Sequence, residues 1–183
     1  MRRFDKALLA LVAVVLPHPL AAQQPPAMIS AAQPEGVAQA LRFAGYDVEL
    51  VVDDLGDPMI ETEFSDLTGS VLFYGCDAES HEGCNSVQLR VGLDRAEPMS
   101  LEFLNREFGD DRFYAVHLDD EGDPWFNWEI MTGTGEGIPT SVFLLAVKEF
   151  ATQVAAASAV VFAEEREKDA DFSAPELRKA DTI

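Results

Sequence analysis

Residues 46–64 read YDVELVVDDLGDPMIETEF. The segment Leu55-Gly56-Asp57-Pro58 separates two runs, 46–53 and 59–64, that are rich in alternating and β-branched residues. Such alternation is typical of strands, and Gly, Asp and Pro between two strands are typical of a tight turn. The stretch therefore predicts a β-hairpin, and the neighbouring segments extend it in both directions.

Two further strands are expected after this hairpin, at residues 70–74 (SVLFY) and 86–93 (SVQLRVGL). The loop between them begins at Gly75 and contains both cysteines of the chain. Before the hairpin, apolar residues recur at helical spacing over 34–44, and Gly45 stands where a left-handed glycine ends a helix. The first half of the chain thus predicts one helix followed by four strands in meander order.

The second half repeats part of this pattern. Residues 100–108 predict a short helix with Ser100 as its N-cap, and residues 113–118 and 125–131 predict two strands. The turn between these strands is Asp119-Asp120-Glu121-Gly122-Asp123-Pro124, so Gly-Asp-Pro closes both predicted hairpins. We interpret this as one helix-and-hairpin unit used twice.

A long apolar segment, residues 142–163, ends the folded part, with Pro139 expected at the first helical position. One helical stripe holds the largest apolar side chains: Phe143, Val147, Phe150, Val154 and Val161. Lys148, Glu149 and Gln153 interrupt the segment, which favours a helix packed on a core over a membrane span. Alanines at 151, 155 and 159 allow close approach to a sheet or to a second subunit.

The expected order is helix, four strands, helix, two strands, long helix. Runs of strands with few helices between them predict an α+β fold, an antiparallel sheet with helices packed on one face.

The N-terminus has the order of a secretory signal peptide. Basic residues at 2, 3 and 6 precede the apolar run 7–16, and a small-residue segment ends at Ala22. Ten apolar residues are too few to span a bilayer, which needs about 20, so we predict cleavage after Ala22. General secretion fits better than twin-arginine export, and no cysteine follows for a lipid anchor.

The chain divides into a signal peptide (1–22), a polar spacer (23–27), a folded domain (28–163) and a charged tail (164–183). Its 183 residues include 33 acidic and 13 basic ones, a net charge of −20. This charge opposes binding to nucleic acid and to anionic lipid. We therefore expect neither a nucleic-acid partner nor stable membrane insertion after cleavage.

Cys76 and Cys84 lie near the two ends of the loop between the third and fourth strands. In an exported chain an even cysteine count predicts a disulfide, and a bridge across a hairpin mouth is geometrically easy. The alternative is a metal site, because Cys76, Asp77, His81 and Cys84 are all possible zinc ligands. Their spacing matches no standard zinc motif, so the disulfide is favoured and no cofactor is expected.

Acidic side chains gather in both hairpin turns, at Asp53, Asp54 and Asp57 and again over 119–123. Calcium is one reading, but neither cluster has the twelve-residue loop of an EF-hand. The simpler explanation is that these aspartates accept hydrogen bonds from the backbone of their own turn. Hydrolase chemistry would require Ser86 or Ser100 to meet His117 and an aspartate, and no nucleophile motif supports it. We expect no enzymatic activity.

Trp125 and Trp128 lie on the last predicted strand, on opposite faces. Core packing is the first explanation for both tryptophans. A tryptophan on the outer face of the sheet would also be a good anchor for a protein partner. These two residues are the candidate binding surface.

Seven short motifs in this order resemble the YbjN domain family over residues 28–163. They are Ala44-Gly45-Tyr46, Gly56-Asp57-Pro58, Phe73-Tyr74-Gly75-Cys76, Cys84, Leu104-Asn105, Arg112-Phe113 and 119–124. Where many relatives have Trp and a second Asn just after the position of Asn105, this chain has Glu107 and Phe108.

The family is described as bacterial sensory transduction regulators, and its fold resembles type III secretion chaperones, which are small acidic dimers. The resemblance implies the same order of helices and strands and supplies no catalytic residue. The signal peptide distinguishes this member from cytoplasmic relatives. We therefore expect an exported module that binds a protein or peptide, with a homodimer as one expected state; the alternative is a periplasmic metal-binding protein using the cysteine loop or the acidic turns.

Overall fold

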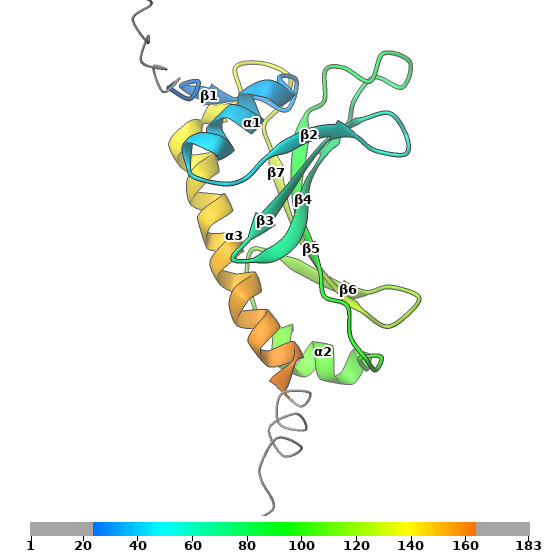
Figure 1. Ribbon diagram of the computed structural model, residues 1–183. Coiled ribbons are helices and arrows are strands. Elements are labelled where there is room, and N and C mark those ends of the chain that lie inside the picture. The colour runs from blue at the N-terminus through cyan, green and yellow to red at the C-terminus, as the bar shows by residue number, and fades with distance from the viewer. Residues whose placement is uncertain (1–23, 164–183) are drawn as a thin grey trace, which may run out of the picture.

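The computed structural model describes residues 24–163. Helices α1 (Pro34–Phe43), α2 (Leu101–Phe108) and α3 (Thr140–Val161) lie on one side of an antiparallel sheet of six strands (Figure 1). The strands are β2 (Glu49–Val52), β3 (Pro58–Phe64), β4 (Leu67–Tyr74), β5 (Ser86–Gly92), β6 (Ala115–Leu118) and β7 (Pro124–Met131). A second sheet joins β1 (Met28–Ile29) to β8 (Ile138–Pro139). The predicted α+β class is confirmed.

The strand order across the large sheet is β2-β3-β4-β5-β7-β6. The first four strands form the predicted meander, because each pairs with the next along the chain. The last two enter in reverse order, since β7 pairs with β5 and leaves β6 at the edge. In each helix-and-hairpin unit, the first strand of the hairpin therefore lies at an edge of the sheet: β2 at one edge and β6 at the other.

The two Gly-Asp-Pro turns have the same hydrogen bonds. The Asp53 carboxylate accepts the backbone N–H groups two and four residues further on, both at 2.9 Å. The Asp119 carboxylate does the same at 3.0 and 2.9 Å. Gly56 and Gly122 have φ of 96° and 86°, a backbone conformation that favours glycine. The two turns of the unit inferred from the sequence therefore share the same hydrogen bonds and the same glycine conformation.

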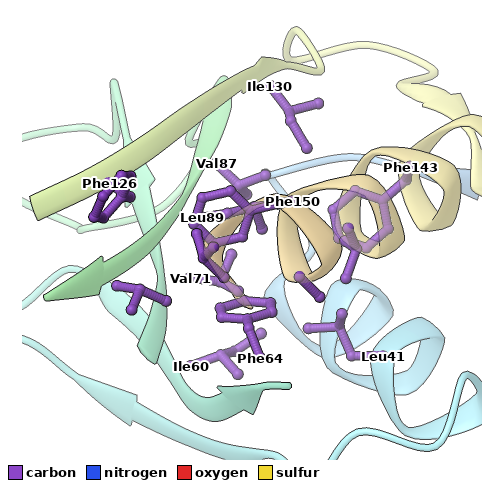
Figure 2. Close-up of a cluster of buried hydrophobic side chains, with 14 of the residues drawn as sticks. Leu41, Ile60, Phe64, Val71, Val87, Leu89, Phe126, Ile130, Phe143 and Phe150 are labelled. Atoms are coloured by element: carbon purple, nitrogen blue, oxygen red, sulfur yellow. The ribbon is translucent and has the colours of Figure 1, made fainter. Parts of the chain in front are cut away.

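The core lies between the sheet and the helices (Figure 2). The buried side of α3 carries the predicted stripe, and Phe150 meets the Phe64 ring edge-on at a centroid distance of 5.1 Å. Leu41 of α1 faces this cluster from the neighbouring helix, and Phe126 of β7 closes it at the far end of the sheet. This burial confirms α3 as a core-packing helix, although its length and composition alone would allow a membrane span.

Local signals for the helix ends are confirmed. The N–H of Tyr46 donates to Leu41 O and that of Gly45 donates to Arg42 O. A left-handed glycine permits this pair of hydrogen bonds at the end of a helix. Ser100 caps α2 by accepting the Phe103 N–H at 3.2 Å.

Two details of the sequence analysis are wrong. Pro139 is not the first helical residue: it pairs with Met28 in β8 and precedes α3. The segment 24–27, predicted as a spacer, is bound to the domain, since Ala27 O accepts the Thr140 N–H at 3.0 Å. Short strands of two residues leave no periodic pattern, so the sequence does not reveal them.

Candidate functional site

The loop between β4 and β5 contains the predicted disulfide between Cys76 and Cys84. Within the loop, Asp77 accepts the N–H groups of Ser80 at 2.9 Å and Glu79 at 3.1 Å. These bonds, that of Ser80 above all, hold the pKa of the Asp77 carboxyl below its usual value. The loop is thus closed by a covalent bond and ordered by one carboxylate.

His81 connects this loop to the turn between β2 and β3. Its Nδ1 lies 2.8 Å from Asp57 Oδ1, and its ring packs directly on Gly56. The left-handed backbone of His81, with φ of 57°, points the imidazole at the turn. The sequence analysis missed this contact, because nothing in the sequence places two loops side by side.

Most of the side chains considered as metal ligands in the cysteine loop and the acidic turns already have other partners. Both sulfur atoms of the loop belong to the disulfide, and the Asp53 and Asp119 carboxylates accept the N–H groups of their own turns. Within residues 24–163, no three His, Cys, Asp or Glu side chains converge as a metal site requires. The disulfide closes the cysteine loop, and the two carboxylates stabilise the acidic turns.

None of the described helices lies over the outer face of the sheet (Figure 1). Register places a continuous apolar row, Val51, Met59 and Leu72, across β2, β3 and β4. Tyr74 of β4 and Met131 of β7 flank Ser86 at the end nearer the disulfide, with 42% and 65% of their surfaces exposed. We call these five apolar residues the outer band.

Acidic side chains surround the outer band. Glu49 and Glu61 are direct cross-strand partners, and Glu63 and Glu129 lie on the same face. Like charges placed directly opposite one another destabilise a sheet. Arg90 is the one arginine on this face of the described strands. The outer face is therefore apolar in the band and negative around it.

Trp125 lies on this outer face, and its ring packs against strand β5. Its ring rests on Gly92, where an added Cβ would come within 2.8 Å of the indole. The guanidinium of Arg90 lies 4.1 Å from the ring centroid, and Nε1 donates to Asp119 at 2.9 Å. That hydrogen bond, followed by backbone bonds, holds the pKa of the Asp119 carboxyl below its usual value. Glycine inside a predicted strand was the available signal for this close approach.

Trp128 lies on the inner face and belongs to a different environment. It stacks on Phe113 at a centroid distance of 5.3 Å with an interplanar angle of 7°. Phe113 has φ of 80° and 62% of its surface is exposed, an uncommon conformation for a bulky residue. The two tryptophans therefore do not form one surface, and only Trp125 faces the open side.

Two of the candidate hydrolase residues, Ser86 and His117, lie far apart in the sheet. His117 pairs with Trp125 and Ser86 with Met131, which separates them by six positions of β7, roughly 20 Å. The Ser100 hydroxyl accepts an N–H at the start of α2, and His117 Nδ1 lies 3.1 Å from Asn127. His117 is therefore out of reach of Ser86.

Hollows lie on the helical side. One of about 370 Å³, between α2 and the end of α3, is lined by Phe108, Phe113, Tyr114 and Val160. Another of about 760 Å³ lies between the start of α1 and residues 81–84.

The predicted cleavage bond after Ala22 and the tail 164–183 lie outside the described residues.

No curated protein matches this chain in sequence. A family model matches residues 33–163, that of YbjN, described as "Putative bacterial sensory transduction regulator". The match spans all three helices and the whole six-stranded sheet. This chain therefore belongs to the YbjN family.

Proposed function

We propose that this chain is an exported, non-enzymatic regulatory domain that binds an extended protein or peptide segment on the outer face of its sheet. The observation that carries the proposal is the outer band: five partly or largely exposed apolar residues on a sheet face that no described helix covers. Exposed apolar groups gathered on one face mark interaction sites in soluble proteins. The separation of His117 from Ser86 supports a binding role over catalysis.

The charge around the band selects the partner. Four glutamates face solvent on this side of the sheet, and Glu49 and Glu61 oppose each other directly. A segment with lysine or arginine would lie between these carboxylates and remove the repulsion, while its apolar residues cover Met59 and Leu72. The expected partner is therefore a basic, partly apolar segment in extended conformation.

The two tryptophans allow a test that reports each face separately. We expect a short peptide of alternating lysine and valine to shift the emission of Trp125 in the Trp128→Phe variant, saturably and less at high ionic strength. The Trp125→Phe variant, which retains only Trp128 on the inner face, should not respond. Fluorescence titration measures both, and the matching glutamate peptide is the ligand control.

Charge-matched variants separate this site from general attraction to an acidic protein. Glu49→Gln with Glu61→Gln should weaken binding at least about fivefold, by loss of roughly 1 kcal/mol. Glu102→Gln with Glu136→Gln removes the same charge elsewhere and should change it less than twofold. Equal effects of the two pairs would refute the outer face as the site.

Export rests on the order of basic, apolar and small residues over 1–22. We expect the periplasmic protein to have the intact mass of a chain that begins at Gln23. Leu11→Arg places a charge in the apolar run and should leave the precursor uncleaved in the cytoplasm. A wild-type protein that retains Met1 and stays in the cytoplasm would disprove export.

A further inference from the structure

One row of cross-strand partners crosses the outer face of the sheet from β2 to β6. Each of the six strands contributes one residue, and register joins each residue to the next. In the order of the sheet, the residues are Glu49, Glu61, Ser70, Arg90, Asn127 and Ala115. This row, which we call the charged row, therefore has two negative charges at its β2 end and one positive charge on β5, two strands beyond Glu61.

Arg90 is held in place without being neutralised. Its guanidinium stacks on the ring of Trp125, 4.1 Å from the centroid, and its Nε is buried without a hydrogen-bond partner within residues 24–163. Two neighbouring carboxylates bond to other groups. Glu129 accepts a hydrogen bond from Gln88 at 3.2 Å. Asp119 accepts one from the indole N–H of Trp125. Arg90 therefore keeps a positive charge that pairs with no carboxylate of the described residues.

The side chains on either side of Arg90 in the charged row are neutral hydrogen-bonding groups. Ser70 on β4 and Asn127 on β7 are its direct cross-strand partners, and both are partly exposed. The amide nitrogen of Asn127 lies 3.1 Å from His117 Nδ1, which fixes the orientation of the amide. A guanidinium, a hydroxyl and an amide can all donate hydrogen bonds to a carboxylate. The middle of the charged row can therefore bind one carboxylate, in contrast to its β2 end.

We propose that the segment bound on the outer face carries an acidic residue four positions from a lysine or arginine, and that Arg90 binds this carboxylate. The inference rests on the proposed function, because it concerns the same segment and the same face. Strands lie about 4.8 Å apart, so Arg90 is roughly 12 Å from the middle of the pair formed by Glu49 and Glu61. An extended segment advances about 3.4 Å per residue, and side chains an even number of residues apart point the same way. A separation of four residues, about 14 Å, therefore matches the two charged points, whereas two residues, about 7 Å, fall short.

The positions between the two charges fit the rest of the face. The residue midway between them lies over Ser70, which leaves room for a small polar side chain. Met59 and Leu72 lie two residues along β3 and β4 from the charged row and are cross-strand partners. The alternate side chains of the segment can lean toward this apolar pair. The expected pattern in the partner is therefore basic, apolar, small, apolar, acidic.

Two peptides that differ at one position test the inference by isothermal titration calorimetry with the purified chain. They are Lys-Lys-Val-Ser-Val-Glu and Lys-Lys-Val-Ser-Val-Gln, both acetylated and amidated. We expect the glutamate peptide to bind at least about fivefold more tightly. General electrostatic attraction gives the opposite order, because the protein has a net charge of −20 and the glutamate peptide is the less basic ligand.

A third peptide tests the spacing. Lys-Lys-Val-Glu-Val-Ser has the same composition and net charge as the glutamate peptide, but neither lysine is four positions from the glutamate. We expect it to bind no more tightly than the glutamine peptide, because its carboxylate cannot reach Arg90 while a lysine lies between Glu49 and Glu61. Equal binding of the two glutamate isomers would disprove the predicted spacing.

Variants of the protein assign the preference to Arg90. Arg90→Gln should remove it and change the Kd of the glutamine peptide less than about twofold. Arg90→Lys keeps the charge but not the planar guanidinium, so the preference should fall to about twofold. Arg106→Gln removes the same charge on α2 and should keep the full preference. Glu49→Gln with Glu61→Gln should weaken the glutamate and glutamine peptides alike and preserve the ratio of their Kd values.

The outcomes separate this inference from the proposed function. If the glutamate and glutamine peptides bind equally, or the glutamine peptide binds more tightly, the carboxylate site is refuted and the outer face remains a binding surface. A preference that persists unchanged in Arg90→Gln assigns the carboxylate to another group of the protein and also overturns the inference. If no peptide binds the wild-type chain up to about 1 mM, the proposed function and the inference both fail.

Discussion

Replacing Phe150 with alanine is expected to lower the free energy of unfolding by about 3–5 kcal/mol. The ring is fully buried on α3 and packs edge-on against Phe64 of β3. Truncation removes this contact and leaves a cavity where helix and sheet meet, and a close-packed core collapses only partly around such a hole. Urea denaturation followed by circular dichroism measures the loss.

Phe43→Ala is the matched control, because Phe43 is also a helical phenylalanine but is exposed on α1. We expect it to change the free energy of unfolding by no more than about 0.5 kcal/mol. Similar losses at the two positions would mean that α3 does not form the core of the domain.

Removal of the disulfide by Cys76→Ala with Cys84→Ala is expected to cost about 2–3 kcal/mol. The bond closes a short loop, with a sequence separation of 8, and restricts the unfolded chain. The same loop holds His81 against Asp57, so its release should also increase amide exchange at the turn between β2 and β3. Urea denaturation and hydrogen exchange measure the two effects.

Reduction provides the control for the substitutions themselves. Wild-type protein in excess dithiothreitol should lose the same stability as the double alanine variant, and the variant should not respond to the reductant. His81→Ala in the oxidised protein should increase exchange at residues 53–57 while the loop stays closed. If reduction leaves the denaturation midpoint unchanged, the bond between Cys76 and Cys84 does not contribute to stability.

Local patterns account for the elements that the sequence predicted correctly. The alternation in 46–64, the cap at Ser100 and the glycine at 45 act over a few residues, and the structure confirms each of them. The disulfide follows from two cysteines at the mouth of one hairpin. These features involve neighbours along the chain, so no knowledge of the tertiary arrangement is required.

The candidate site was only partly predictable, because its contacts join distant strands. Trp125 could be assigned to the outer face from the two-residue period of a strand. Its neighbours Arg90 and Gly92 come from β5, which reaches β7 only through the sheet. Phe113 and Trp128 likewise meet across a loop and a strand. Which residues share a surface depends on register, and register is not local.

By itself, the sequence determined the three helices, the six strands of the large sheet, the repeated Gly-Asp-Pro hairpins and the α+β class, because hydrophobic period and turn chemistry are local properties. Only the tertiary structure decided that β7 enters beside β5 and that β6 forms an edge. It also decided which side of α3 is buried and which is left uncovered. Those choices come from the joint burial of apolar faces from distant segments, a cooperative outcome that no single segment specifies.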